Sequence, residues 1–344
     1  MKKIMVVLLL CSWLNIFVYS QEKKEEQRSE QAINHDTNQE SVQKTALLSG
    51  QILEQKIQQL VSAKTPGQRA TAAMALGNYR DKKAVIALIE ALNTEKIVVQ
   101  KHAVKSLGKI CNRHEINLLI QNCKNDNKLS DAEKNEKIHG YKEITEICEK
   151  SVIPALVAKA KDTDADLRKN VVVALGKTGS ISVEKTLLES LDDISEAIRE
   201  EAVSGLGNIG SQKSIQKIAK MLSFDPKRSV RRTCAEVLGK IGDNSTIPLL
   251  KKALEETKKE PKDTFIHLTI CASLKQLGDD TGIPILINAL EDESDSVKTT
   301  AIGLLGMLKE KRAIDALTKL SKNDKSSTVK DSATRALKEI KGEK

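Results

Sequence analysis

Aromatic side chains are scarce in this sequence: seven of the 344 residues, or 2%, are Phe, Trp or Tyr. Three of the seven, Trp13, Phe17 and Tyr19, lie within the first twenty residues. The rest of the chain must build its core from Ala, Val, Ile and Leu, which suits closely packed helices. Because proteins bind single-stranded nucleic acid largely by stacking its bases on aromatic residues, we expect no nucleic-acid partner.

Groups that carry catalysis are also few. The five histidines, His35, His102, His114, His139 and His267, are dispersed, and no Ser-His-Asp arrangement or phosphate-binding loop stands out. The nearest approach to a metal-ligand set is Cys111, His114, Cys123 and Cys148. Only the Cys-x-x-His pair in that set has a usable ligand spacing. We therefore predict no catalytic residue, no metal site and no cofactor.

Only the N-terminus contains a long apolar run. A basic start at residues 1–3 precedes an almost wholly apolar stretch at 4–18, and Val18-Tyr19-Ser20 fits a cleavage site. The run is short for a transmembrane helix, which needs about 20 apolar residues. We predict that residues 1–20 are a bacterial secretory signal peptide and that the protein is periplasmic or secreted.

Two alternatives to this cleavage stay open. The apolar run could be retained as a membrane anchor, or a lipid could be attached at Cys11. Leu10 argues against the lipid, because it is bulkier than the small residue that a lipidation motif has at this place. After cleavage no later segment is expected to span a membrane.

Residues 21–44 are polar and densely charged, so few of their side chains could be buried. We predict that they form a flexible linker. The net charge of the whole chain is +9 and becomes +7 when Lys2 and Lys3 leave with the signal peptide. This balance either belongs to the solvated face of a lysine-rich helical protein or favours an acidic partner.

One stretch recurs along the rest of the chain, and its clearest copy runs from Ser229 to Leu250. In each copy an aliphatic residue precedes an anchor position, which is Gly239 in this copy. The nine anchors are Gly77, Gly108, Thr145, Gly176, Gly207, Gly239, Lys275, Gly306 and Lys338. A mostly small residue five positions before each anchor keeps the same register.

The residues before each anchor have the spacing of an amphipathic helix, which we call helix B. The anchor glycine and a glycine three residues later are expected to end helix B, the later one as a left-handed C-cap. These later glycines are Gly179, Gly210, Gly242 and Gly278. Prolines such as Pro248 then start the next helix, A. Because one pair cannot bury its own apolar face, neighbours must stack. The sequence predicts an all-α fold, an α-solenoid of about nine helix pairs at 45–341.

The pattern Val-Arg-x-x-Ala-x-x-x-Leu-Gly-x-Ile-Gly-Asp-x-x-Ile-Pro-x-Leu resembles HEAT repeats, in particular the short bacterial repeats named after phycobilisome lyases. The resemblance covers about residues 45–340 and implies an armadillo-like helical fold. Proteins with such repeats include scaffolds, inhibitors, lyases and hydroxylases, so the resemblance does not decide the function.

Two enzyme classes within this resemblance do not match the residues of this chain. Deoxyhypusine hydroxylases bind iron through several His-Glu pairs, whereas this chain has one, His114-Glu115, which follows an anchor instead of lying in helix B. A phycobilin lyase would need aromatic residues to hold a tetrapyrrole, and these are few. We therefore predict that the protein is not an enzyme.

Two copies of the repeat are longer than the others. The extra residues lie around 122–136 and 255–263, between helix A and helix B, and both segments are rich in lysine. We expect both to emerge from the same edge of the solenoid. There they either vary in length without consequence or flank a binding surface.

A mostly basic column lies eight residues before the anchors. Its members are Arg69, Gln100, Lys137, Arg168, Arg199, Arg231, His267, Lys298 and Lys330. In HEAT-like repeats this position commonly pairs with acidic turn residues, here Asp166, Glu196 and Asp295. Within the column we predict Arg168, Arg199, Arg231 and Lys298 as contacts for a partner.

Five cysteines remain after signal cleavage. Cys234 lies in the small core column and Cys271 is one residue from it, so both are predicted to be packed in the core. Cys111 and Cys148 hold the same position in adjacent repeats, which places them about 10 Å apart, farther than the roughly 7 Å that a disulfide spans between Cα atoms. We expect no disulfide between them unless the longer repeat is irregular.

These observations lead to three hypotheses about function. In the first, a non-catalytic exported scaffold binds a partner protein, an acidic one by charge, through the preformed surface of successive B helices. In the second, the chain is a lyase or hydroxylase built on this repeat. In the third, the lysine-rich insertions bind an anionic envelope polymer or lipid headgroup.

Overall fold

The computed structural model describes residues 48–93, 96–257 and 263–342. The predicted signal peptide, 1–20, and linker, 21–44, lie outside these described residues. The chain divides into two compact units, Met1–Gln59 and Leu60–Lys344. In the first unit residues 48–59 are described and are helical. In the second, the described residues form helices joined by short turns, with no strand among them.

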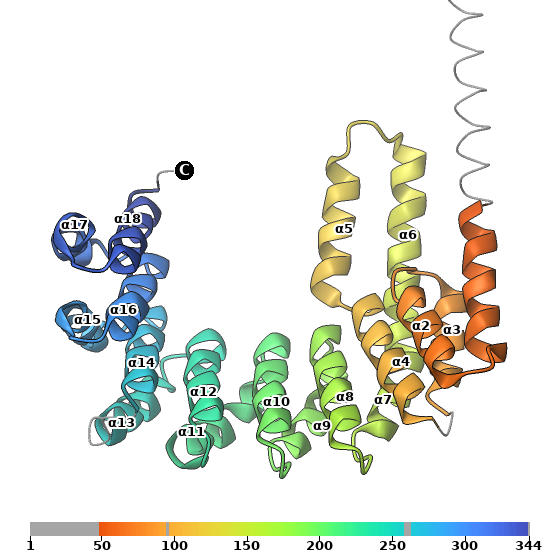
Figure 1. Cartoon of the computed structure of the whole chain (residues 1–344), viewed down its shortest axis with the longest axis horizontal. Helices are drawn as coiled ribbons and strands as arrows, with labels where there is room; N and C mark the ends of the chain where they lie inside the picture. The colour runs from red at the N-terminus through yellow and green to blue at the C-terminus, as the bar shows by residue number, and fades with distance from the viewer. Residues whose placement is uncertain (1–47, 94–95, 258–262, 343–344) are drawn as a thin grey trace, which may run out of the picture. The chain divides into compact units, whose positions relative to one another are not determined.

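The second unit contains a row of B helices, each packed on the next. They are α2 (Pro66–Leu76), α4 (Ile97–Ile110), α8 (Ala165–Thr178), α10 (Glu196–Ile209), α12 (Arg228–Ile241), α14 (Thr264–Gln276), α16 (Asp295–Met307) and α18 (Ser327–Lys341). The A helices are α3 (Lys82–Ala91), α7 (Ile153–Lys159), α9 (Glu184–Ser190), α11 (Ile215–Phe224), α13 (Ile247–Thr257), α15 (Ile283–Asn288) and α17 (Ile314–Asn323). The predicted all-α solenoid is confirmed, and Figure 1 shows the B helices side by side.

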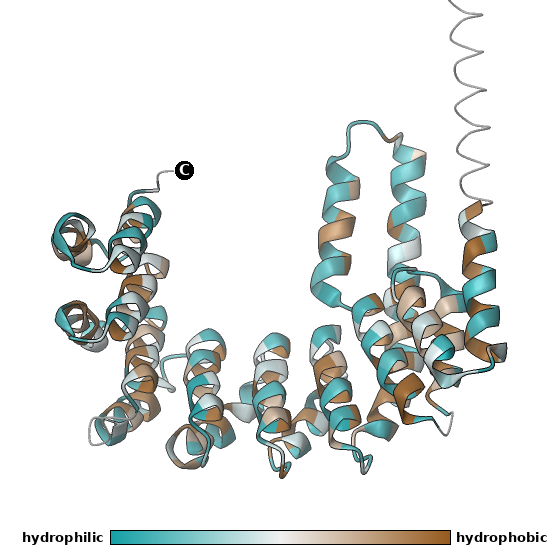
Figure 2. Cartoon of the chain, viewed as in Figure 1, coloured by the Kyte–Doolittle hydropathy of each residue, from teal (hydrophilic) through white to brown (hydrophobic). Residues whose placement is uncertain are grey.

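The core is aliphatic and follows the repeat, as Figure 2 shows by the apolar stripes on the helices. The leucines before the anchors are fully buried: Leu76, Leu107, Leu175, Leu206, Leu238, Leu274 and Leu305. Cys234 and Cys271 are also fully buried, so their predicted packing role is confirmed. Among the described residues, none of the helices has both the length and the hydropathy that crossing a bilayer requires.

Gly77 caps the end of α2 as predicted. The other anchor glycines lie inside their helices, so the prediction that they end helix B is wrong for Gly108, Gly176, Gly207, Gly239 and Gly306. Gly176 lies inside α8, where an added Cβ would lie 2.8 Å from the Cα of Gly205 in α10. At Gly108 in α4 it would lie 2.8 Å from the Cβ of Ala174 in α8. Both distances are shorter than van der Waals contact. Glycine is required here because the backbones of neighbouring B helices approach closely.

The glycines three residues after the anchors lie at helix ends at all four predicted places, and three of the four are left-handed. Gly179, Gly210 and Gly278 have φ of 59°, 67° and 88°, in the left-handed region that glycine adopts without steric cost. Gly242 is the exception, since its φ of −71° and ψ of 165° are extended. The chain leaves α12 at this point without a left-handed residue.

The third helix pair, α5 (Arg113–Asn125) and α6 (Asp131–Ile147), departs from the row. Because α4 packs directly on α8, this pair is left out of the stack of B helices. In Figure 1, α5 and α6 lie against each other as a hairpin that projects from the end of α4. The insertion at 122–136 lengthens these two helices and supplies the turn at 126–130 that joins them.

A lack of glycine explains this departure. Between Gly140 and Gly176 the sequence has no glycine. Thr145 occupies the anchor position, which holds glycine in six of the nine copies, and Cys148 occupies the position three residues later, which holds glycine in four. Since no residue there readily takes the left-handed conformation, α6 does not end. It continues through a π-helical turn, Cys148–Val152, directly into α7.

The same departure brings Cys111 and Cys148 together. They form a disulfide with their Cα atoms 5.8 Å apart, so the expectation of no disulfide is wrong and its stated exception applies. Cys111 caps the C-terminal end of α4, and Cys148 begins the π-helical turn. The bond therefore closes the base of the α5–α6 hairpin.

The two insertions leave the row at different edges, which corrects the expectation of one shared edge. The hairpin starts after the C-terminal end of α4, whereas residues 255–263 lead into the N-terminal end of α14. Of this second insertion, residues 258–262 lie outside the described part of the chain.

Candidate partner-binding surface

Basic side chains of the B helices reach forward to aspartates in the following A-to-B turns. The four pairs are Arg168–Asp193, Arg199–Asp225, Arg231–Asp263 and Lys298–Asp324, at 2.9, 2.7, 2.6 and 2.8 Å. We call these pairs the ladder. Each pair joins one repeat to the next, so the ladder helps to fix the distance between neighbouring repeats.

Arg199 shows how completely the guanidinium is used. Its Nε and Nη2 donate to the two carboxylate oxygens of Asp225 at 2.7 and 2.9 Å. Its Nη1 donates to the backbone oxygens of Asp193 and Ile194 at 3.0 and 3.3 Å. The side chains of Arg199 and Asp225 are 12% and 4% exposed. A planar fork with fixed donors suits this geometry, and lysine could not reproduce it.

Three aspartates of the ladder, Asp193, Asp225 and Asp324, have a pKa below the usual value and are held in their charged form. Burial by itself would raise the pKa of Asp225, but the hydrogen bonds from Arg199 and from the Lys227 N–H lower it further, leaving it below the usual value. The pKa of Asp193 is lowered against its burial in the same way, by Arg168 and the Ser195 N–H. Each of these carboxylates therefore also stabilises its own turn by accepting a backbone N–H within it.

The predicted acidic partners are correct in one case. Asp295 contacts Lys298 at 3.1 Å, but Asp166 pairs with Lys101 and Glu196 pairs with Lys227. The ladder instead uses the turn aspartate about one repeat later. One local feature marks these turn aspartates. The carboxylate accepts a hydrogen bond from the backbone N–H of the residue two positions later, as at Asp193, Asp225 and Asp324.

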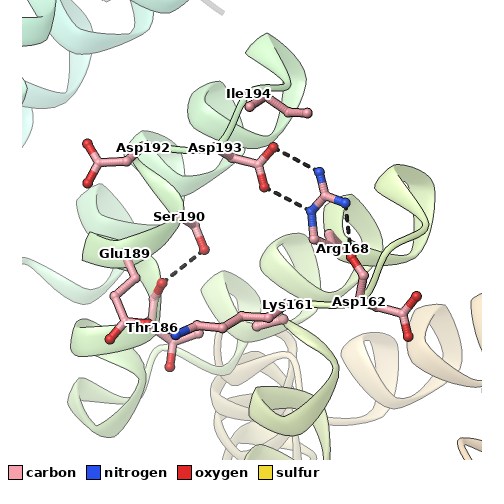
Figure 3. A pocket seen from close by; sticks show the side chains of 10 residues that line it. Lys161, Asp162, Arg168, Thr186, Glu189, Ser190, Asp192, Asp193 and Ile194 are labelled. Carbon is pink, nitrogen blue, oxygen red and sulfur yellow. Dashed lines mark hydrogen bonds and ion pairs between the residues drawn. The ribbon is translucent and has the colours of Figure 1, made fainter.

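A hollow of about 400 Å³ lies beside the first pair of the ladder, and Figure 3 shows its lining. Arg168 bonds Asp193 at its edge, and Lys161 pairs with Glu189 at 2.9 Å across it. Asp192 is paired with Lys217 at 2.6 Å. Each of these charged groups is therefore already paired within the chain.

The cysteines and histidines of the sequence do not assemble into a metal site in the part of the chain that the structure describes. Cys111 and Cys148 are bonded to each other, and Glu115 of the His114-Glu115 pair bonds Arg80 at 2.6 Å. Burial, and more weakly the charge of Asp225, raises the pKa of the Cys234 thiol. That thiol is therefore protonated at neutral pH and is not a nucleophile.

A second hollow, of about 560 Å³, lies on the exposed face of α12, α14 and α16. Its lining is largely apolar and includes Ala272, Leu304 and Met307, with Glu236 and Lys240 among the polar residues. Met307 is 56% exposed. The surface of the B helices is thus uneven, with an apolar hollow at this place.

Acid is expected to weaken the turn between α16 and α17. Hydrogen bonds from Arg312 at 2.7 and 2.8 Å are the main reason that the pKa of Glu310, whose side chain is 6% exposed, falls to about 2. The unfolded chain, with an ordinary glutamate pKa of about 4.3, binds the proton first as the pH falls. The stabilisation from Glu310 is therefore complete above about pH 4.3 and is lost as the pH approaches 2.

The variant Glu310→Gln is expected to be less stable than the wild type by about 1–2 kcal/mol at neutral pH, because it loses a charged hydrogen bond. The difference should narrow by more than half at about pH 3, where the wild type has lost most of this contribution. Urea unfolding followed by circular dichroism at several pH values measures both quantities. A difference that stays constant with pH would show that the carboxylate charge plays no part.

The fold places the protein in the class of α-solenoids, in which successive helix pairs stack on one another. The family model for HEAT repeats matches residues 53–129, 184–266 and 262–338, and the chain belongs to this family.

Two curated relatives are deoxyhypusine hydroxylases. The one from Arabidopsis thaliana is 31% identical over 109 residues, covering 31% of this chain and 34% of the relative. The one from Candida glabrata is 26% identical over 98 residues, covering 28% and 30%. The chain spans about a third of the length of these relatives.

Two solved structures are similar in fold. The complex of CpcE and CpcF of phycocyanin lyase from Nostoc is 18% identical, with 84% of this chain and 94% of that chain covered and a TM-score of 0.44. Human deoxyhypusine hydroxylase in complex with glycerol is 17% identical, with 87% and 99% covered and a TM-score of 0.34.

Proposed function

We propose that the protein is a non-catalytic, exported HEAT-repeat scaffold that binds a partner protein through the exposed face of its stacked B helices. One observation carries this proposal: the framework positions repeat, whereas the position three residues before the anchor changes from helix to helix. In the row of B helices this position is at least partly exposed except in α14, where Ala272 is buried. In row order this position holds Met74, Lys105, Val173, Ser204, Glu236, Ala272, Gly303 and Arg335. A surface of varied chemistry on a repeated framework is suited to recognising one particular partner.

The ladder supports the same proposal. Arg168, Arg199, Arg231 and Lys298 hold adjacent repeats in a set spacing before any partner arrives. A preformed surface loses little conformational entropy on binding. We retain these four residues as proposed contacts near the N-terminal ends of the B helices, in addition to their role within the chain.

Export is part of the proposal. It rests on the apolar run before Gln21, and the disulfide between Cys111 and Cys148 supports it. Disulfides persist in oxidising compartments and are rare in the cytosol. Fractionation of cells, followed by N-terminal sequencing of the mature protein, tests it: cleavage before Gln21 and recovery outside the cytosol are expected.

Site-specific photocrosslinking in cells tests the binding surface. A photoreactive residue is placed on exposed positions of B helices, at Lys105, Glu236 or Gly303, where an added side chain at Gly303 meets no other atom within 4 Å. Matched controls place it on exposed positions of A helices, at Gln216 or Lys319. Discrete adducts of one partner are expected from the B positions and should be absent from the A positions.

Two results would contradict this proposal. Adducts that form equally from the A and B positions would mean that no binding face exists. Purified protein that contains iron or zinc in stoichiometric amount would favour the lyase or hydroxylase hypothesis over a non-catalytic scaffold.

A further inference from the structure

Acidic residues are nearly missing from three consecutive B helices. Together α2, α4 and α8 contain one acidic residue, Asp166. The same helices carry seven cations: Arg69, Lys101, Lys105, Lys109, Arg168, Lys169 and Lys177. The next helix in the row, α10, has three glutamates and one arginine, so the excess of positive charge is confined to this part of the row.

Some of these cations are neutralised within the chain. Lys101 forms an ion pair with the one acidic residue, Asp166, at 3.1 Å, and Arg168 is paired with Asp193 in the ladder. Lys109 donates to the uncharged amide oxygen of Asn78 at 2.6 Å. Within the described residues Lys105, Lys169 and Lys177 have no carboxylate within ion-pair distance. We call Lys105, Lys109, Lys169 and Lys177 the basic stripe.

The stripe is continuous across two helices. Lys105 and Lys109 are one helical turn apart in α4, a rise of about 6 Å. Lys109 and Lys177 hold the same repeat position, and α4 and α8 approach so closely that only glycine fits at position 108. Helices in such contact lie about 8–10 Å apart, so the four charges share one face. Lys105, Lys109 and Lys177 are exposed.

The remaining titratable group on α4 does not offset this charge. Burial, and to a lesser degree the charge of Lys105, lowers the pKa of His102. The imidazole is therefore neutral at neutral pH, and the charge of the stripe comes from the lysines alone. In α2, the neighbour on the other side, Met74 and the residues around it include no carboxylate.

Apolar side chains flank the stripe, and they bear on the kind of ligand. Met74 in α2, 49% exposed, and Val173 in α8, half-buried, hold the same repeat position as Lys105. A protein segment can place apolar side chains against them, whereas a bare polyanion cannot. None of the three helices has an aromatic residue on which a nucleic-acid base could stack.

We infer that the basic stripe is the docking site for an acidic segment of a partner protein, one that alternates carboxylates with small apolar side chains. This inference rests on the proposed scaffold function and specifies the chemistry of the partner. Carboxylates on every second residue of an extended segment are about 6–7 Å apart, which matches the spacing of Lys105 and Lys109.

The test compares two charge-reversed triple variants of the full chain. The first is Lys105→Glu/Lys109→Glu/Lys177→Glu. The matched control is Lys220→Glu/Lys319→Glu/Lys322→Glu, which makes the same change of charge on exposed positions of α11 and α17. These two are A helices, so the control leaves the proposed binding face of the B helices unchanged. Circular dichroism confirms that both variants are folded.

The probe is a fluorescein-labelled peptide of Glu-Leu-Glu-Ala repeats, and binding is followed by fluorescence anisotropy. The stripe variant is expected to bind this peptide roughly tenfold to a hundredfold more weakly than the wild type, because three exposed ion pairs are replaced by repulsion. The control variant should change the affinity by less than about twofold. Raising the salt concentration should weaken binding to the wild type.

Three outcomes would overturn the inference: equal binding by the wild type and the stripe variant, equal binding of the Gln-Leu-Gln-Ala peptide, or tighter binding of a single-stranded oligonucleotide of matched charge.

Failure of the inference is distinguishable from failure of the scaffold proposal. If the stripe variant keeps the crosslinks at Glu236 and Gly303, the scaffold proposal stands without the stripe. If the protein with an unchanged stripe forms no crosslinks at Glu236 and Gly303, the scaffold proposal itself is wrong.

Discussion

The variant Arg199→Ala is expected to lower the free energy of unfolding by about 3 kcal/mol or more, because it leaves a buried carboxylate charged and unpaired. Asp225, 4% exposed, would keep the Lys227 N–H but lose both bonds from the guanidinium. The backbone oxygens of Asp193 and Ile194 would lose their donor as well. Arg199→Lys should recover only part of the loss, since lysine lacks the planar fork.

The matched control is Arg232→Ala in α12. Arg232 and its partner Glu236 are 54% and 57% exposed, so this pair contributes about 0.5 kcal/mol or less. Adding Asp225→Ala to Arg199→Ala should restore part of the stability by removing the orphaned charge. A double variant as unstable as the sum of its single variants would show that the pair does not interact.

Urea unfolding is the first measurement for this series. Repeat proteins unfold in segments when the coupling between neighbours weakens, so a single two-state transition is not assumed. Native-state hydrogen exchange gives the position of the loss: protection should fall first around the α9–α10 and α11–α12 turns. Uniform loss along the row would contradict a local role for the ladder.

The double variant Cys111→Ser/Cys148→Ser is the second change with a large expected effect. The disulfide joins residues 37 apart, and in the chain-entropy model closing a loop of this length stabilises the fold by about 4 kcal/mol. The hairpin of α5 and α6 packs outside the row of B helices and depends on this bond at its base. We expect the hairpin to lose protection from exchange while α10 to α18 keep theirs.

Peptide mapping without reduction is the direct check, since it should recover the Cys111 peptide linked to the Cys148 peptide. The control is Cys123→Ser, a free cysteine within the hairpin that is 9% exposed. It should cost about 1 kcal/mol or less, because it introduces one small polar group and breaks no crosslink. Equal destabilisation by the control and the double variant would mean that the disulfide contributes little.

Much of the fold could be predicted because its signals are local. The fully buried leucines before seven of the nine anchors and the fully buried Cys234 follow from helical spacing alone. The left-handed glycines at 179, 210 and 278 follow from the cost of that conformation for other residues. The meaning of the anchor glycine was misread, because a glycine near a helix end can serve either as a cap or as a place of close contact.

The candidate surface was predicted less well. The basic column was found, but its partners depend on which turn faces which helix, and one of the three partners expected was correct. The basic stripe was not found at all, although the lack of acidic residues in α2, α4 and α8 is present in the sequence. That lack becomes a surface feature only because α4 and α8 are neighbours, with 54 residues between Ile110 and Ala165.

By itself the sequence determined the all-α repeat fold, the register of its core and most of the helix ends, because these depend on side-chain spacing and on the conformational preferences of glycine and proline. Only the tertiary structure decided which helices stack. Leaving α5 and α6 out of the row brought Cys111 to Cys148 and α4 to α8, and so created both the disulfide and the stripe. Such contacts join residues far apart in the chain, and their formation depends on how whole helices pack together.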